Sequence, residues 1–228
     1  MKIIQVDLNK DYSEVINEAV NILNYGGTII YPTDTLYGLG ANVLNEIAVR
    51  KVFRIKERSF SKPLPLIARN YAWVKELAEV SSKIHKTLEK IWPLGEGFGA
   101  KPGISVGKIT AVLPKKDIVP NALTAETKTV GIRIPDYVFL DKLLAKFGYP
   151  LTSTSANISN QEPTNDINKI IEIFSKSIVK PDLIIDAGIL PKSEPSIVID
   201  LTGSNPKVLR ISPTKPEMLL KLLELGVK

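Results

Sequence analysis

The chain has 228 residues, of which 44% are hydrophobic and 24% are charged, a balance that predicts a globular fold rather than a disordered or fibrous one. It contains no cysteine and a single histidine, which excludes thiol nucleophiles, disulfides, cysteine zinc sites and metal centres built on several histidines. Thirty basic and twenty-four acidic side chains leave a formal net charge of +6, which is compatible with polyanionic partners such as nucleotides or nucleic acid.

The length favours one domain, because single hydrophobic cores stop growing only beyond about 250 residues. Charged residues come early, at Lys2 and Asp7, so the apolar core of a signal peptide is not expected. No apolar run approaches the ~20 residues that a membrane-spanning helix needs. We therefore expect a cytoplasmic protein that does not contact membranes.

Apolar blocks of strand length alternate with helical patterns along the whole chain, which predicts an α/β (mixed α+β) fold. We expect a twisted mixed parallel and antiparallel sheet with flanking helices and a central cleft. Strands are expected at residues 3–7, 28–31, 64–68, 109–113, 130–134, 151–153, 183–186, 197–201 and 208–211. Helices are expected at residues 15–23, 45–54, 71–77, 82–91, 137–147, 166–174 and 215–225.

Residues 94–108 contain five glycines in fifteen positions, which predicts a flexible loop. The loop is not a Walker A motif, because three rather than four residues separate Gly103 from Gly107, and Lys108 is followed by Ile109. We expect this loop to be a mobile lid or an insertion at the edge of the cleft, and a closed lid would exclude water from a substrate bound there. Contact with RNA through Lys101 and Lys108 is the alternative.

Three segments place polar side chains directly after an apolar strand or helix. Residues 31–40 read YPTDTLYGLG, which fits either a ligand site at a strand end or a turn capped by Asp34. Lys56, Arg58 and Lys62 follow the second helix, where they either complement its dipole or bind a triphosphate or nucleic-acid backbone. Residues 152–159 carry six hydroxyl or amide side chains, a set that can bind phosphate without histidine or cysteine.

Six blocks of this sequence occur in the order of one known family. They are YPTDT at 31–35, KER at 56–58, VGIRIP at 130–135, TSAN at 154–157, SIVID at 196–200 and LR at 209–210. Together they resemble the YrdC/Sua5/YciO family over nearly the whole chain. The resemblance implies a single YrdC-like domain covering residues 1–228, without the additional C-terminal domain of the longer Sua5 proteins.

Known members of this family include L-threonylcarbamoyladenylate (threonylcarbamoyl-AMP) synthases. The resemblance implies a nucleotidyltransferase that converts L-threonine, bicarbonate and ATP into threonylcarbamoyl-AMP and pyrophosphate, with Mg²⁺ accompanying ATP. The adenylate serves the formation of N6-threonylcarbamoyladenosine (t6A) in tRNA. Implied partners are therefore tRNA or double-stranded RNA and a downstream t6A-transfer complex.

The resemblance also implies roles for individual residues. Thr33, Arg133 and Ser196 match positions that hold threonine. Positions around ATP and its phosphates are matched by Lys56, Arg58, Lys62, Thr129, Ser155, Asn157, Thr164 and Arg210. Lys56 and Arg58 are the expected catalytic residues, through positioning and charge neutralisation, and no protein metal site is expected.

The sequence departs from the family pattern at several positions. Family members usually read Trp-Pro-Gly-Pro-Leu-Thr, whereas the glycine-rich loop here separates Trp92-Pro93 from Ile109-Thr110. Asn160 stands where a glycine usually follows Ser-Ala-Asn-x-Ser, and Ile197 replaces the threonine of a Ser-Thr-Val block. Two alternatives therefore accompany the main hypothesis: an RNA-binding protein that has lost catalysis, and an enzyme that adenylates a carbamoyl group on another acceptor.

Overall fold

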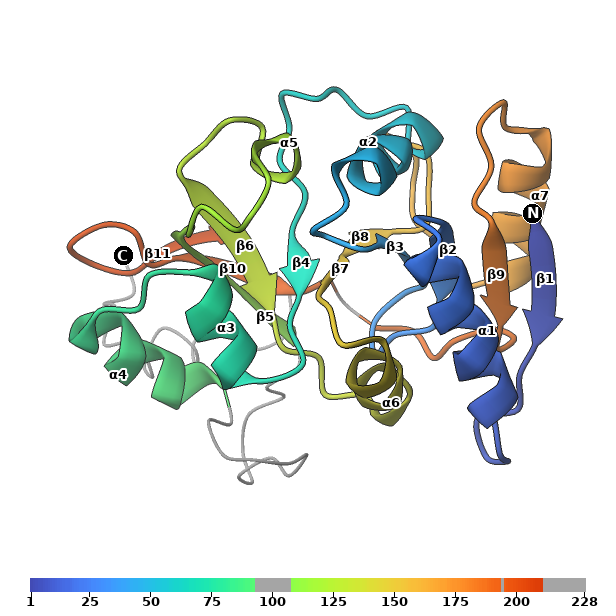
Figure 1. The fold of residues 1–228 in the computed structure, drawn as a ribbon, viewed down its shortest axis with the longest axis horizontal. Helices are drawn as coiled ribbons and strands as arrows, with labels where there is room; N and C mark the ends of the chain where they lie inside the picture. Colours follow the sequence, from blue (N-terminus) through green and yellow to red (C-terminus); the bar gives the residue numbers. More distant parts are fainter. Residues whose placement is uncertain (93–107, 194, 211–228) are drawn as a thin grey trace.

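The computed structural model describes residues 1–92, 108–193 and 195–210, and its strands form two mixed sheets (Figure 1). The expected glycine-rich loop at 94–108, apart from Lys108, and the expected helix at 215–225 lie outside the described residues. No helix in the described ranges is long and apolar enough to cross a membrane.

The first sheet has five strands and the second has six. The order in the first is β1 (Lys2–Gln5), β9 (Leu183–Asp186), β2 (Thr28–Tyr31), β3 (Gly38–Ala41) and β8 (Thr154–Ser155). The order in the second is β11 (Lys207–Arg210), β10 (Ile197–Asp200), β5 (Ile109–Pro114), β6 (Thr129–Arg133), β4 (Leu66–Ile67) and β7 (Leu151–Thr152). Both sheets combine parallel and antiparallel pairs, so the mixed fold class is confirmed.

The expected single sheet is divided in two, but the halves remain joined at one point. Asn42, just after β3, forms an isolated bridge with Leu151 of β7. The Thr152 hydroxyl accepts a hydrogen bond from the Ala41 amide at 3.1 Å, and the Tyr31 hydroxyl donates to the Thr152 carbonyl at 3.1 Å. The two sheets are therefore hydrogen-bonded to each other where β3 ends and β7 lies.

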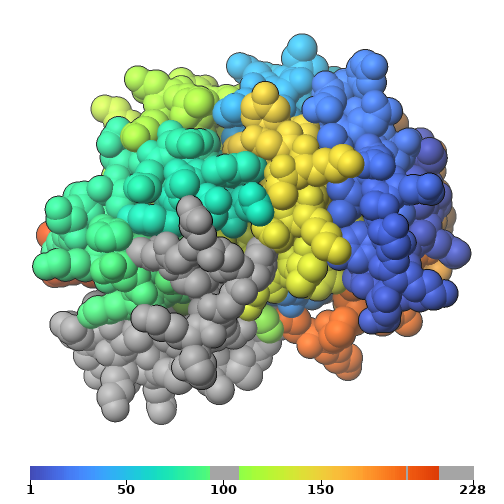
Figure 2. All heavy atoms as spheres, turned by 60° about the horizontal axis from the view of Figure 1, so that its bottom comes forward, coloured from blue at the N-terminus to red at the C-terminus, as the bar shows by residue number. Residues whose placement is uncertain are grey.

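Seven helices lie within the described residues. They are α1 (Ser13–Asn24), α2 (Glu46–Ile55), α3 (Tyr71–Leu77), α4 (Ser82–Ile91), α5 (Asn121–Thr124), α6 (Val138–Phe147) and α7 (Ile167–Lys176). One core cluster joins α1 and α6 to one face of the first sheet, and a larger cluster contains the buried faces of α2, α4 and α7. In Figure 2 the region around α6 lies between α1 and the α3–α4 region, as this packing requires.

Local sequence signals account for much of this arrangement. The Asn45 side chain accepts a hydrogen bond from the Ala48 amide at 3.1 Å, which caps α2 as expected. Gly26 has φ of +74° just after α1, a conformation that glycine adopts without steric cost. The expected strand at 28–31 and the expected helices at 71–77 and 82–91 match β2, α3 and α4.

Strand β3 is the main element that the sequence did not predict. Gly38 and Gly40 suggested a loop, yet Gly38–Ala41 pairs with β2 in antiparallel register. A Cβ atom on Gly40 would lie 2.5 Å from a ring carbon of Tyr31, so the glycines let the buried Tyr31 ring lie against the strand. The segment from Pro32 to Tyr37 is consequently the connection of a β-hairpin, which fixes where Thr33 and Asp34 lie.

Candidate active site

A cleft of about 470 Å³ opens between the two sheets. The first sheet and its β2–β3 connection contribute Thr33, Gly38 and Ser155 to the walls. Strands of the second sheet contribute Thr110 of β5 and Arg133 of β6, which are cross-strand partners, together with residues of β10 and β11. The expected central cleft is present, and it lies where residues distant in sequence converge.

A smaller pocket of about 290 Å³, which we call the basic pocket, adjoins the cleft. Its lining contains Lys56, Arg58 and Lys62 from the segment after α2, and Ser155 and Asn157 from the segment around β8. Arg58 and Ser155 line both cavities, so the two form one polar surface. The structure thus brings together two of the polar segments that the sequence analysis singled out.

Lys56 is buried at the base of the basic pocket, with 2% of its surface exposed. Its Nζ donates to the Ser155 carbonyl at 2.6 Å, the Asn157 carbonyl at 2.7 Å and Asn157 Oδ1 at 3.1 Å. Burial and the nearby Arg58 guanidinium lower the pKa of Lys56 to about 7. This lysine therefore holds the segment 155–157 in place through three uncharged oxygen atoms.

Arg58 and Asn157 are fixed by local hydrogen bonds. Arg58 donates from Nε to the Lys62 carbonyl at 3.1 Å and from Nη2 to the Pro63 carbonyl at 3.0 Å, and burial lowers its pKa. Asn157 donates to the Ile158 and Gln161 carbonyls, while its Oδ1 also accepts from the Ser155 hydroxyl at 2.6 Å. These contacts hold the walls of the basic pocket in one arrangement.

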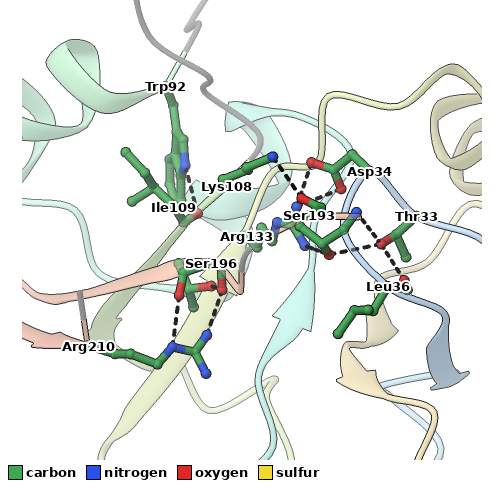
Figure 3. Close-up of polar contacts among 12 residues, drawn as sticks. Thr33, Asp34, Leu36, Trp92, Lys108, Ile109, Arg133, Ser193, Ser196 and Arg210 are labelled. Carbon is green, nitrogen blue, oxygen red and sulfur yellow. Dashed lines mark hydrogen bonds and ion pairs between the residues drawn. The ribbon is translucent and has the colours of Figure 1, made fainter. Parts of the chain in front are cut away.

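Arg133, at the end of β6, forms a buried ion pair with Asp34 (Figure 3). Its Nη2 lies 2.6 Å from both Asp34 carboxylate oxygens, and its Nη1 donates to the Thr35 hydroxyl at 3.3 Å. Thr33 and Thr35 share a hydroxyl–hydroxyl hydrogen bond at 3.0 Å, and Thr33 donates to the Leu36 carbonyl at 2.6 Å. The hairpin connection and β6 thus form one polar network at this end of the cleft.

Ser196 and Arg210 lie together on the opposite part of the cleft wall (Figure 3). Arg210 donates from Nε to the Ser196 carbonyl at 2.8 Å and from Nη2 to the Ser196 hydroxyl at 2.9 Å. The Ser196 hydroxyl also lies 3.1 Å from the Thr110 hydroxyl. Burial, and then the charge of Arg133, lower the pKa of Arg210.

A family model matches residues 21–212; it is described as telomere recombination and covers the Sua5, YciO and YrdC proteins. The chain belongs to this family. A curated putative threonylcarbamoyl-AMP synthase of Methanocaldococcus jannaschii is 36% identical over 203 residues, which cover 88% of this chain and 87% of that protein. The expected membership of the YrdC/Sua5/YciO family is therefore confirmed.

Solved structures of the family agree with the fold. Pyrococcus abyssi Sua5 complexed with L-threonine matches with a TM-score of 0.84 at 30% identity, covering 98% of this chain and 61% of that one. Escherichia coli YciO matches with a TM-score of 0.78 at 28% identity, covering 97% of this chain and 98% of that one. This chain thus spans nearly all of YciO but less than two thirds of the Pyrococcus protein.

Most of the expected site residues line the two cavities, and one does not. Thr129, at the start of β6, lines the cleft, and Lys62 lines the basic pocket. Thr164 is absent from the lining of both; its hydroxyl accepts from the Asp166 amide at 3.1 Å, just before α7, although the preceding Pro163 does line the cleft. The ATP-binding role of Thr164 remains a prediction.

Two charged residues, Asp34 and Lys108, lie next to Arg133 or Asp34 in this YrdC-like site without lining the cleft or the basic pocket. The sequence favoured either a ligand site at this strand end or a turn capped by Asp34, and it did not indicate the pairing with Arg133, which is 99 residues away in the chain. Lys108 was assigned to the loop, yet its Nζ donates to the Ser193 hydroxyl at 2.8 Å, and its charge lowers the pKa of Asp34. Lys108 stands before Ile109-Thr110, where family members usually carry proline. This departure from the family pattern was the sequence feature that could have drawn attention to Lys108.

Proposed function

We propose that this protein is a threonylcarbamoyl-AMP synthase, which joins L-threonine, bicarbonate and ATP and releases pyrophosphate. Family membership and the 36% identity to the Methanocaldococcus protein support this reaction. The main structural support is that the cleft and the basic pocket are continuous, since Arg58 and Ser155 line both. A nucleotide with its phosphates in the basic pocket brings its α-phosphorus beside an amino acid held in the cleft.

The reaction can rest on positioning and charge neutralisation. The threonine amine and bicarbonate form an N-carboxylate and water, and a carboxylate oxygen then attacks the α-phosphorus while pyrophosphate leaves. Arg58 and Lys62 supply positive charge for the phosphate oxygens, and the Ser155 hydroxyl is a further donor. Lys56 places this segment through its three hydrogen bonds and adds its charge below the leaving group.

The threonine would lie at the Arg133 end of the cleft. Arg133 offers a guanidinium for the substrate carboxylate, and the hydroxyls of Thr33 and Ser196 offer partners for the substrate side chain. Asn157, Thr129, Thr164 and Arg210 complete the proposed ATP site. A pocket that pairs a substrate hydroxyl discriminates strongly against an analogue that lacks it, because its own polar groups are then left without a partner.

Mg²⁺ would enter with ATP rather than occupy a site made by protein side chains alone. Within the described ranges, no group of three or more histidine, aspartate or glutamate residues could hold a metal ion. Magnesium commonly keeps several waters and binds largely through substrate phosphates, which fits the hydroxyl and amide groups of the basic pocket. With ATP bound, the ion would neutralise charge on the phosphates.

The product implies further partners. Threonylcarbamoyl-AMP is an activated acyl donor for N6-threonylcarbamoyladenosine in tRNA, so we propose that a t6A-transfer complex accepts it and that tRNA is the final recipient. These steps belong to the cytoplasm, where ATP, threonine and tRNA meet. The net charge of +6 favours a direct approach of RNA as well.

Pyrophosphate release is the direct test. The purified protein is supplied with ATP, Mg²⁺ and bicarbonate, and each amino acid is tested in turn, with bicarbonate omitted as a control. We expect release with threonine and much less with 2-aminobutyrate, which lacks the hydroxyl. Release with a different amine would instead identify a carbamoyl adenylation on another acceptor. RNA binding without release under any condition would refute the enzymatic proposal.

A further inference from the structure

The Asp34–Arg133 ion pair lies where the proposed substrate carboxylate must bind. The side chains are 13% and 8% exposed, and the 2.6 Å contacts place both carboxylate oxygens of Asp34 on one guanidinium nitrogen. Arg133 lines the cleft and Asp34 lines a second cavity behind it, so the pair places one positive and one negative group side by side in the cleft wall. An α-amino acid has the complementary pair, because its carboxylate and its ammonium are attached to the same carbon.

This geometry constrains how an amino acid can bind. A substrate carboxylate bound to Arg133 would share that guanidinium with Asp34, whose two oxygens already contact it, so the ammonium on the adjoining carbon would have this carboxylate beside it. An ammonium has no lone pair and cannot attack bicarbonate, so it must lose a proton before the carbon–nitrogen bond forms. Asp34 is the nearest carboxylate to Arg133 among the ion pairs of the described residues.

We propose that Asp34 binds the α-ammonium of the amino acid substrate and accepts its proton before carboxylation, an inference that rests on the proposed synthase function. The proton moves from the substrate nitrogen to an Asp34 oxygen and leaves the nitrogen lone pair free. That lone pair forms the carbon–nitrogen bond with bicarbonate, and the N-carboxylate and one water are produced. Asp34 would thus be a catalytic residue, alongside the charge-neutralising groups of the basic pocket.

The surroundings of Asp34 suit this exchange. Burial raises the pKa of Asp34, and Arg133 opposes that rise, so engagement of Arg133 by the substrate carboxylate favours proton uptake by Asp34. Lys108, the residue before β5, also lowers the pKa of Asp34. Tyr137, before α6, faces the same carboxylate: its own pKa is raised by burial and then by the charge of Asp34.

Asp34 also has a route by which the proton can leave. A second cavity, of about 890 Å³, is lined by Asp34 and Thr33 together with Asp7, Asp186 and the residues after β1 and β9. Thr33 lines both this cavity and the cleft, so the ion pair lies in the wall between them. A proton taken from the substrate on the cleft side can therefore pass to water on the other side.

The test compares Asp34→Asn with wild type across pH. We expect Asp34→Asn to lower kcat/KM for threonine by about 100-fold or more near pH 7, in the range of general-base catalysis, with ATP affinity by calorimetry unchanged. The ratio of the wild-type kcat/KM to that of the variant should fall toward 1 as the pH approaches 9.5, where free threonine supplies a neutral amine. A loss that does not vary with pH would mean that Asp34 only positions Arg133, and it would overturn the proposal, as would no loss.

Two further measurements keep the test decisive. Asp117→Asn alters an exposed aspartate that lines none of the three cavities and should behave as wild type. If Asp34→Asn does not fold, wild type is tested with 3-hydroxybutyrate, which lacks the ammonium: binding at least 10-fold weaker than that of threonine supports the proposal, and equal binding overturns it. Failure of wild type to release pyrophosphate with any amine would instead refute the synthase function itself.

Discussion

The buried cations at the two ends of the candidate active site, Lys56 and Arg133, have different kinds of partner. In the basic pocket, Lys56 donates to two backbone carbonyls and one amide oxygen, all of them uncharged. At the other end of the cleft, Arg133 faces a full carboxylate, that of Asp34. The hydrogen-bond partners of Lys56 thus include no carboxylate, whereas Arg133 is paired with one. This difference supports the proposal that ATP binds at the first end and the amino acid at the second.

Removal of Arg133 should have the largest effect. Arg133→Ala leaves the buried Asp34 carboxylate without its guanidinium, and loss of one partner of a buried ion pair costs about 3–5 kcal/mol of unfolding free energy. Pyrophosphate release with threonine should fall to background, because the substrate carboxylate loses its partner. Urea denaturation and the pyrophosphate assay measure the two effects.

The double variant Asp34→Ala/Arg133→Ala sharpens this prediction. It removes both charges, so it should recover part of the lost stability but none of the activity. If Arg133→Ala were as stable as the double variant, the buried Asp34 carboxylate would not depend on Arg133 for its stability. In that case the contrast between the two ends would not hold.

Replacement of Arg58 should have an intermediate effect that is confined to the basic end. Arg58→Ala should weaken ATP binding by about 1.5 to 3 kcal/mol, as expected for hydrogen bonds to charged groups, and should leave threonine binding in place. Arg54→Ala is the matched control, because Arg54 is an exposed residue one turn earlier in α2 and lines neither cavity. Calorimetry that gave equal ATP affinities for the two variants would contradict the assignment of the phosphates.

The sequence was sufficient for those parts of the fold that depend on local signals. The apolar repeat after Asn45 and the buried run at 28–31 predicted α2 and β2 because burial and capping act within one element. Strand β3 was missed because Gly38 and Gly40 have no β preference of their own. They are glycine because of the Tyr31 ring, which reaches them only after the strands have paired.

The candidate site likewise has parts that the sequence indicated and parts that only the structure shows. Its basic segment and its hydroxyl-rich segment stood out in the sequence, but the contact between them joins Lys56 to Asn157 across 101 residues. The Asp34–Arg133 pair is equally distant and leaves no periodic signal, so only the folded sheets reveal it. For the same reason the sequence suggested that Lys56 contacts phosphate, whereas its donors are used within the protein.

The stability of the protein should also depend on pH, through a residue of the basic pocket. The pKa of Lys56 is lowered from 10.5 to about 7 by burial and by Arg58, whereas the unfolded chain keeps the ordinary value. Between about pH 7 and pH 10.5 the unfolded state therefore binds a proton that the folded state does not. Stability rises with pH wherever the unfolded state binds more protons, so this lysine makes the unfolding free energy increase across that window.

Lys56→Met tests this directly, because it keeps most of the side-chain volume but cannot titrate. The difference in unfolding free energy between wild type and the variant, measured by urea denaturation from pH 6 to pH 10, should move in favour of wild type as the pH rises. Lys51→Met is the control, because Lys51 pairs with Asp182 at 2.6 Å, near the surface and away from both cavities. If the difference in unfolding free energy between wild type and Lys56→Met did not change with pH, the three oxygen acceptors would hold Lys56 fully charged. The basic pocket would then keep this positive charge throughout that pH range.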